Sequence, residues 1–404
     1  MARTWEEKSG GITAPRGFLA AGVAAGIKYK GKRDVALIFS GVPARTAGVF
    51  TTNRVKGAPV IVTMERVARG YARAVVINSG NANTCNGEQG IRDARAMAQE
   101  AARVLNIPEE DVLVASTGVI GQPMPMDRVL PGIAAAAREL SPGGGAAAAE
   151  AIMTTDTEPK EAALSLTLGG HTVTIGGMAK GSGMIHPSMA TMLCFISTDA
   201  AVSPSCLQET LRYAVDRSFN MISVDGDTST NDMVLVLANG LAGNPEIAAE
   251  NEDYYLFRDA LTEVCTRLAR AVARDGEGAT KLLEVKVINA ASEKDARLAA
   301  RAVVASNLVK TAVYGRDANW GRVICAVGYS GAQFDPDRVD IYLGDVMVAR
   351  DGMALPFDEE AASAALAGRE VRVLVDLKSG ECEATAWGCD LTGEYVNINA
   401  SYRT

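Results

Sequence analysis

The 404-residue chain has few of the side chains on which several common kinds of site depend. It contains only two histidines, His171 and His186, so a catalytic triad with histidine as its base has almost no residue to use. Its seven cysteines are widely scattered and form no CxxC pair, which argues against a disulfide framework and against a zinc ribbon. No segment reaches the ~18 apolar residues of a membrane span.

A basic stripe is also absent from the sequence. The formal net charge is −8 and the pI is about 5.1, so neither nucleic acid nor an anionic membrane is expected as a partner. The N-terminal stretch is polar and has no apolar segment of a secretory signal, and together with the unpaired cysteines this predicts a cytoplasmic protein. Aromatic residues make up 5% of the chain and hydrophobic residues 48%, which is typical of an α/β protein with an aliphatic core.

Short apolar runs and amphipathic stretches alternate along the chain, which predicts a mixed α/β fold. A helix is expected at 91–105 and a longer one at 254–273. A hairpin is expected around Gly169-Gly170, and a separate C-terminal α/β unit from about residue 285. Strands are predicted at 35–39, 46–50, 60–62, 74–77, 112–115, 164–168, 172–176, 192–196, 233–237 and 282–288.

The stretch 180–199 combines a flexible segment with a buried strand. It begins with Lys180 and a Gly-Ser-Gly turn, and Ala190-Thr191 stands directly before the apolar run 192–196. This arrangement suits self-cleavage, in which Thr191 Oγ attacks the Ala190 carbonyl, an ester forms by an N→O shift, and water hydrolyses it. Thr191 would then have a free α-amine, whose pKa near ~8 lets it accept the proton of its own hydroxyl. The alternative is a glycine-rich turn that leads into an ordinary core strand.

Two other loops contain groups that a reaction of this kind needs. Thr117-Gly118 follows a predicted strand and offers a hydroxyl and a backbone N–H side by side, as an oxyanion hole requires. Glu277 lies between two glycines, where it either solvates its loop or anchors a cationic amine. His171 is expected to be solvated in its turn, and a helper role of His186 in cleavage is a weaker alternative.

Motifs for metal and nucleotide binding are incomplete. Asp225, Asp227 and Asp232 are spaced like a cation loop, but the glycine and the bidentate glutamate of an EF-hand are missing. We therefore expect no metal there, and a loop whose aspartates accept hydrogen bonds from its own backbone. The segment 276–281 lacks the Walker spacing, and no Gly-x-Gly-x-x-Gly follows a strand, so nucleotide binding is not expected.

Taken together, these segments make the chain similar to the bifunctional ornithine acetyltransferase/glutamate N-acetyltransferase family of arginine biosynthesis. The resemblance extends from Gly17 to Thr404, and several motifs in the same order make it specific. The motifs that carry it are Asn78-Ser-Gly-Asn-Ala-Asn83, Ser116-Thr-Gly-Val-Ile-Gly121, Thr154-Thr-Asp-Thr157, Lys180-Gly-Ser-Gly-Met-Ile185, Met189-Ala-Thr-Met-Leu193, Asp225-Gly-Asp-Thr-Ser-Thr-Asn231, Asp275-Gly-Glu-Gly-Ala-Thr-Lys281 and Asn397-Ile-Asn-Ala-Ser-Tyr402.

The resemblance implies a precursor that cleaves itself between Ala190 and Thr191 into an α chain, 1–190, and a β chain, 191–404. The implied fold is a layered α-β-β-α sandwich like that of N-terminal-nucleophile enzymes, over about 1–284, with a smaller C-terminal α/β domain over 285–404. The two fragments are expected to assemble as an α₂β₂ heterotetramer.

The resemblance also implies the site residues and the reaction. Thr191 is the nucleophile, and Thr117 and Gly118 hold the oxyanion. An acetyl group passes from N2-acetyl-L-ornithine to L-glutamate through an acetyl-Thr191 ester. No cofactor is required, and acetyl-CoA is a second donor in bifunctional members. The residues implied to contact substrate are Thr154, Lys180, Thr191, Glu277, Asn399 and Thr404.

Two other functions stay open at this point. One is a self-processing N-terminal-nucleophile amidohydrolase or aminopeptidase, which would use water in place of glutamate as the acceptor. The other is a non-catalytic protein that binds a small ligand in a degenerate site. The presence of Thr191 together with Thr117 and Lys180 argues against the second.

Overall fold

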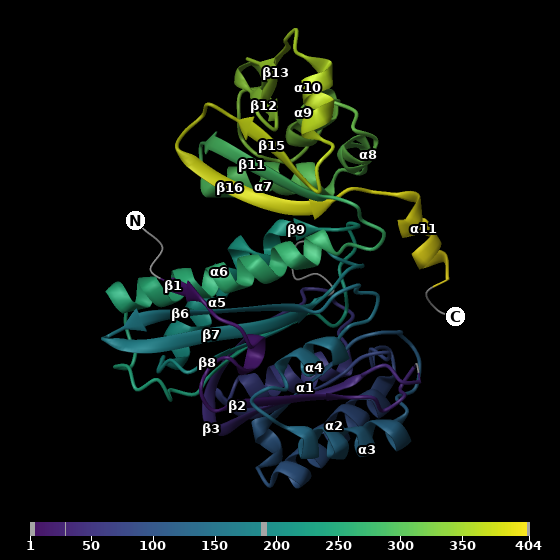
Figure 1. Ribbon diagram of the computed structural model, residues 1–404, viewed down its shortest axis with the longest axis vertical. Coiled ribbons are helices and arrows are strands. Elements are labelled where there is room, and N and C mark those ends of the chain that lie inside the picture. The colour runs from purple at the N-terminus through teal and green to yellow at the C-terminus, as the bar shows by residue number, and fades with distance from the viewer. Residues whose placement is uncertain (1–4, 29, 187–191, 402–404) are drawn as a thin grey trace. The chain divides into compact units, whose positions relative to one another are not determined.

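The computed structural model describes residues 5–28, 30–186 and 192–401 (Figure 1). The chain forms two compact units, each with its own β-sheet, and the expected mixed α/β class is confirmed. Unit 1 comprises Met1–Gly181, Ser188–Asp216 and Thr228–Leu268. Unit 2 comprises Ser182–Pro187, Arg217–Asp227 and Ala269–Thr404. Among the described residues, no helix is long and apolar enough to cross a membrane.

Unit 1 is built on a mixed sheet, which has nine strands within the described residues. Their order is β1-β6-β7-β8-β10-β3-β4-β5, and β2 pairs with β3. The strands are β1 (Trp5–Glu7), β2 (Phe18–Val23), β3 (Val35–Phe50), β4 (Tyr71–Asn78), β5 (Val112–Ser116), β6 (Lys160–Leu168), β7 (His171–Lys180), β8 (Leu193–Thr198) and β10 (Met233–Ala238). The helices are α1 (Ala58–Val67), α2 (Gly87–Leu105), α3 (Met126–Glu139), α4 (Gly145–Ala151), α5 (Pro204–Arg217) and α6 (Glu252–Arg274), with short 3-10 turns η1 (Gly11–Thr13) and η2 (Glu109–Asp111). The last residue of α5 and the segment of α6 from Ala269 onward are assigned to unit 2.

Both faces of this sheet are buried, because alternate residues of one strand enter different cores. In β4, Val75 and Ile77 belong to a core that also contains residues of β7, β8 and β10. Ala74 and Val76 belong to a second core, which is completed by α2 and α3. Helix α4 contacts β2 and β3 as well as β6 and β7, so the sheet encloses this helix between two of its parts.

Strand pairing brings the ends of three strands together at one end of the sheet of unit 1. β8 runs parallel to β10, with Leu193 opposite Met233, and antiparallel to β7, with Leu193 opposite Lys180. The end of β7 and the starts of β8 and β10 therefore lie next to one another. The predicted hairpin is confirmed as well, since β6 and β7 pair up to Leu168 opposite His171.

Two strand predictions need correction. The segment 60–62 is not a strand but part of α1, because Pro59 lies in the first turn of that helix and the Thr63 hydroxyl donates to the Val114 carbonyl (2.6 Å). Packing against β5 thus overrides the β-branched composition of this segment. The segments 35–39 and 46–50 both form strands, but they are parts of the single strand β3, with a register shift between Phe39 and Ala44.

Unit 2 contains a second mixed sheet, whose described strands follow the order β14-β13-β12-β15-β11-β16-β9. Helix α7 packs against β11 and β16. The strands are β9 (Ile222–Ser223), β11 (Leu282–Ala290), β12 (Asp340–Leu343), β13 (Val346–Arg350), β14 (Met353–Ala354), β15 (Glu370–Asp376) and β16 (Cys382–Cys389). The helices are α7 (Glu293–Ala305), α8 (Asn307–Gly315), α9 (Trp320–Gly328), α10 (Glu359–Ala365) and α11 (Gly393–Ala400), with 3-10 turns η3 (Phe219–Met221) and η4 (Pro336–Arg338).

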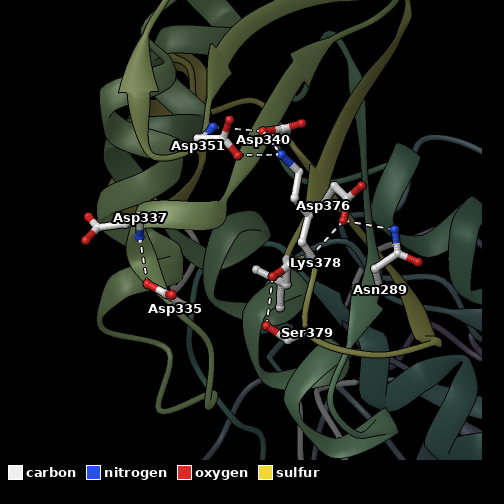
Figure 2. Close-up of polar contacts among 9 residues, drawn as sticks. Asn289, Asp335, Asp337, Asp340, Asp351, Asp376, Lys378 and Ser379 are labelled. Atoms are coloured by element: carbon white, nitrogen blue, oxygen red, sulfur yellow. Dashed lines mark hydrogen bonds and ion pairs between the residues drawn. The ribbon is translucent and has the colours of Figure 1, made fainter.

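A polar cluster connects the ends of several strands of this second sheet (Figure 2). Lys378 Nζ lies 2.7 Å from Asp340 Oδ1 and 2.8 Å from Asp351 Oδ1. Asp376 Oδ1 accepts hydrogen bonds from the Lys378 N–H and from Asn289 Nδ2, both at 2.9 Å. The carboxylates of Asp340, Asp351 and Asp376 are thus each paired with a donor, and these contacts connect β11 and β12 with the turns that follow β13 and β15.

Candidate functional site

The chain directly after the predicted cleavage position is firmly anchored in unit 1. Ala190 and Thr191 lie outside the described residues, and Met192 is the first described residue after them. The Met192 N–H donates to Asp232 Oδ1 (3.0 Å), and the Met192 carbonyl accepts from the Met233 N–H (3.2 Å). Both backbone polar groups of Met192 are therefore bound before β8 begins.

The predicted oxyanion residues follow β5. Thr117 is 3% exposed, and its N–H donates to the Asn78 carbonyl at the end of β4 (3.0 Å). Gly118 has a φ of +130°, and a Cβ at this position would lie 2.3 Å from the carbonyl carbon of Gly80, so only glycine fits. Within the described part of the chain, the Gly118 N–H is bonded to no acceptor. The loop thus offers a hydroxyl and a backbone N–H, the two donors that an oxyanion hole uses.

Lys180 lies beside this loop. It ends β7, is 2% exposed, and has its Nζ 3.5 Å from Thr117 Oγ1. The structure therefore brings two of the predicted site residues, Thr117 and Lys180, into direct contact. A buried ammonium next to two hydrogen-bond donors makes this part of unit 1 suited to an anionic group.

Asp156 supplies the negative charge that balances the lysines here. Its Oδ1 accepts from Lys160 Nζ and from the Gly181 N–H, both at 2.7 Å, and its Oδ2 accepts from the Thr154 N–H (3.0 Å). Burial alone would raise the pKa of Asp156, but the charges of Lys180 and Lys160 outweigh this effect and lower that pKa well below its usual range. The ionised carboxylate therefore connects Thr154 to the end of β7.

The remaining predicted substrate residues belong to unit 2. Glu277 is 8% exposed, and Asn399 Nδ2 donates to its Oε2 (2.6 Å). The Glu277 N–H donates to the Ser182 carbonyl (2.8 Å), and a Cβ on Gly183 would lie 2.4 Å from the Glu277 carboxyl carbon. The carboxylate is thus held by Asn399 of α11 and lies against Gly183, while the Glu277 backbone is bonded to Ser182. Thr404 lies outside the described residues. The roles proposed for all these residues stay predictions.

The aspartate loop follows the sequence expectation only in part, because Asp225 Oδ1 accepts from the Asp227 N–H of its own loop (3.3 Å) but takes its other donors from distant segments. Asp225 accepts hydrogen bonds from the N–H groups of Met184 (2.6 Å) and Ile185 (2.9 Å), and also from the Tyr395 hydroxyl (3.2 Å). Burial raises the pKa of Asp225, and these backbone donors partly offset the effect. Among the described residues, no group of three or more metal-ligating side chains occurs.

The histidines contribute little to these clusters. His171 is exposed at the start of β7, as predicted. His186 Nδ1 lies 3.1 Å from Ser223 Oγ in unit 2. Burial, together with the charge of Arg301, lowers the pKa of His186.

Sequence reasoning missed three positions that the folded chain brings to this site. Asp156 and Asn231 were part of the motifs, and Asp232 was considered only as a cation ligand. Each is a buried polar residue beside a strand end or in a loop. Burial is not visible in the sequence, and the partners that matter most for Asn231 and Asp232, Ser116 and Met192, are distant along the chain.

Comparison with known proteins agrees with these motifs. The chain matches the ArgJ family over residues 19–404. An arginine biosynthesis bifunctional protein ArgJ from Symbiobacterium thermophilum is 65% identical over 398 residues, which cover 98% of this chain and 99% of the relative. A protein of the same name from Caldanaerobacter subterraneus subsp. tengcongensis is 57% identical over 399 residues, again covering 98% of this chain and 99% of the relative.

A solved structure is also similar. A crystal structure of arginine biosynthesis bifunctional protein argJ from Bacillus halodurans is 48% identical, with a TM-score of 0.50. The match covers 98% of that chain and 52% of this one. The family match, the identities and the coverage lead to one conclusion: this chain belongs to the ArgJ family.

Proposed function

We propose that this chain transfers an acetyl group from N2-acetyl-L-ornithine to L-glutamate, releasing ornithine and N-acetylglutamate in arginine biosynthesis. The observation that carries the proposal is the contact of Lys180 with Thr117 in the oxyanion loop. Lys180 is also paired with Leu193, the first residue of β8. Met192, the residue that follows the proposed nucleophile, is bonded to Asp232 and Met233 in the same unit. These contacts support a proposed site in which Thr191 works with the oxyanion donors and the ammonium group.

The proposed cycle is of the ping-pong type. Thr191 Oγ attacks the acetyl carbonyl carbon, and its own α-amine accepts the hydroxyl proton. The Thr117 hydroxyl and the Gly118 N–H stabilise the tetrahedral oxyanion, each contributing about 3 kcal/mol. The C–N bond to ornithine breaks with proton transfer to the leaving amine, which leaves an acetyl-Thr191 ester. The glutamate amine then attacks this ester and departs as N-acetylglutamate.

Substrate recognition follows from the charges. Acetylornithine has an α-carboxylate and a distal ammonium, and we assign the carboxylate to Lys180 and the ammonium to Glu277. Asn399 orients the Glu277 carboxylate through the 2.6 Å hydrogen bond, while Thr154 and Thr404 complete the substrate contacts. Water must be excluded while the ester exists, because hydrolysis would turn the enzyme into a deacetylase.

The proposal includes self-cleavage between Ala190 and Thr191 and assembly of the two fragments as a cytoplasmic α₂β₂ heterotetramer. The Bacillus halodurans chain supports cleavage, because it corresponds to only 52% of this chain, about the share that a fragment 191–404 would have. We propose that no cofactor is required. The word bifunctional in the relatives' names supports a second transfer, from acetyl-CoA to glutamate.

Three measurements test the proposal. Intact mass should show wild type as fragments 1–190 and 191–404 and the Thr191→Ala variant as one chain, whereas a non-catalytic binding protein has no need to be cut. Glutamate should then accelerate the release of ornithine from acetylornithine by wild type. An equal rate of ornithine release with and without glutamate would identify an amidohydrolase. Full activity in the Thr191→Ala variant would show that Thr191 is not the nucleophile. Acetyl-CoA with glutamate alone tests the second activity.

A further inference from the structure

Two adjacent side chains directly before β10 bind the two backbone segments that the proposed reaction requires. We propose that Asn231 and Asp232 are positioning residues: Asn231 sets the loop of Thr117 and Gly118, and Asp232 sets the chain directly after Thr191. Both side chains and both segments belong to unit 1. The inference rests on the proposed function, because it concerns the alignment of the proposed nucleophile with the proposed oxyanion donors.

Asn231 uses all the hydrogen-bonding capacity of its side-chain amide. Its Nδ2 donates to the carbonyls of Ala82 (2.6 Å) and Ser116 (2.9 Å), and its Oδ1 accepts from the hydroxyls of Thr84 and Thr230, both at 2.6 Å. An amide has two donor hydrogens and two acceptor sites, so none is left over. A flipped amide would direct its oxygen at two carbonyls, and the orientation is therefore determined.

These bonds fix the oxyanion loop on both sides. Ser116 directly precedes the loop residues Thr117 and Gly118. Ala82 is connected to the residue that follows them, because the Ala82 N–H donates to the Val119 carbonyl (3.0 Å). Asn231 is 3% exposed, so water does not compete effectively for its bonds. Asn231 thus adds side-chain bonds on both sides of the Gly118 N–H to the backbone bonds that Thr117 and Val119 make with the carbonyls of Asn78 and Gly80.

Asp232 holds the backbone directly before β8 in place, as Asn231 does for the oxyanion loop. Its Oδ1 accepts from the Met192 N–H (3.0 Å), and its own carbonyl accepts from the Thr51 N–H (3.0 Å). Asp232 is fully buried. Burial raises the pKa of Asp232 well above its usual range, against the opposing effects of the Met192 N–H and the charge of Lys180. The side chain therefore acts here as a hydrogen-bond acceptor and not as an exposed charge.

The two residues are neighbours on one strand end, so the distance between their targets is set by the covalent chain. A misplacement of about 1 Å between reacting groups costs on the order of 100-fold in rate. Loss of either side chain should therefore reduce the rate of the chemical step far more than it weakens substrate binding. A purely structural role would reduce stability and leave the kcat of the folded fraction unchanged.

The first experiment compares Asn231→Ala with Asn244→Ala. Asn244 is a matched control, since it is also buried and its Nδ2 also donates to two carbonyls, those of Ala201 and Pro245. For Asn231→Ala we expect kcat for glutamate-dependent acetyl transfer to fall about 10- to 100-fold with KM changed less than about threefold. Asn244→Ala should retain kcat at a similar loss of thermal stability. If Asn231→Ala does not fold, Asn231→Ser, which keeps one donor, replaces it with the same expectation.

The second experiment compares Asp232→Ala and Asp232→Asn with Asp199→Asn. Asp199 is a buried aspartate that follows the other end of β8, where it accepts from the N–H groups of Thr174 (2.7 Å) and Arg16 (3.3 Å). The rate of self-cleavage is followed by intact mass, and kcat is measured on the cleaved fraction. Asp232→Ala should slow both about 10- to 100-fold. Asp232→Asn should restore them to within about threefold, because its Oδ1 remains an acceptor. Asp199→Asn should leave both unchanged.

The outcomes separate this inference from the proposed function. If wild type shows no glutamate-dependent release of ornithine, the proposed function fails. If wild type is active and Asn231→Ala retains its kcat, Asn231 is not a positioning residue. The assignment of Asp232 is overturned if Asp232→Asn is as slow as Asp232→Ala, or if both equal wild type.

Discussion

Gly118→Ala tests the oxyanion loop most directly. The new Cβ would lie 2.3 Å from the carbonyl carbon of Gly80 and 2.5 Å from the nitrogen of Asn81, and both are backbone atoms that no rotamer change can move. Ordinary contact begins near 3.4 Å, so the loop must shift by about 1 Å. The φ of +130° adds about 1–3 kcal/mol of strain for any residue with a Cβ, and overpacking adds about 1–3 kcal/mol more.

The shift displaces the N–H that the mechanism requires. Loss of one oxyanion donor typically costs on the order of 100- to 1000-fold in kcat, or about 3–4 kcal/mol. We therefore expect Gly118→Ala to lower kcat by about that factor, with KM for acetylornithine little changed, and to lose about 2–6 kcal/mol of unfolding free energy. Steady-state kinetics with glutamate present and urea denaturation measure the two effects separately.

Gly121→Ala is the matched control within the same loop. Gly121 also has a positive φ, +74°, but a Cβ there would meet no atom within 4 Å. This variant should lose about 1–2 kcal/mol of stability through backbone strain and keep its kcat. The reasoning is refuted if Gly118→Ala is destabilised yet turns over at the wild-type rate, or if Gly121→Ala loses as much kcat.

Three further outcomes are expected. Glu277→Gln should raise KM for acetylornithine about 10- to 100-fold, because it removes the charge assigned to the ammonium, and an unchanged KM would contradict that assignment. Gly183→Ala should raise the same KM, since its Cβ would lie 2.4 Å from the Glu277 carboxyl carbon and displace it; kinetics equal to wild type would show that the carboxylate tolerates the shift. Asp156→Asn should be less stable than wild type at pH 7, and the difference should shrink as the pH falls below about 4. The reason is that folding lowers the pKa of Asp156 below the unfolded value of ~3.9, so its stabilisation is present above that pH and lost below it. Thermal unfolding from pH 7 to pH 2 measures the effect, and a difference that does not vary with pH would argue against the ion pairs as its cause.

Much of the secondary structure could be predicted because it depends on local patterns. The hairpin around Gly169-Gly170, the helices near 91–105 and 254–273, and the strand after Met192 all appear close to their predicted positions. The prediction failed at 60–62, where Val-Ile-Val composition favours a strand. Pro59 at the helix start, which the sequence does show, and contacts with β5, which it does not, decided that segment instead.

The candidate site was predictable in its chemistry but not in its connections. Residue types alone suggested a hydroxyl nucleophile at Thr191 and an oxyanion pair at Thr117 and Gly118, and the resemblance to a known family added Lys180. Neither source assigned a role to Asp156. Its carboxylate acquires one only when β7 and the loop at 154–157 come together around two lysines.

The amino-acid sequence is sufficient for the periods of strands and helices, for the residues able to do acyl-transfer chemistry, and for membership of the ArgJ family. The fold is needed to show that Asn231 binds the carbonyl of Ser116, 115 residues away, while its neighbour Asp232 binds the Met192 N–H. The physical reason is that periodicity arises from neighbours within a few residues. The hydrogen-bond partner of a buried amide or carboxyl depends instead on which distant segments the folded sheet brings next to it.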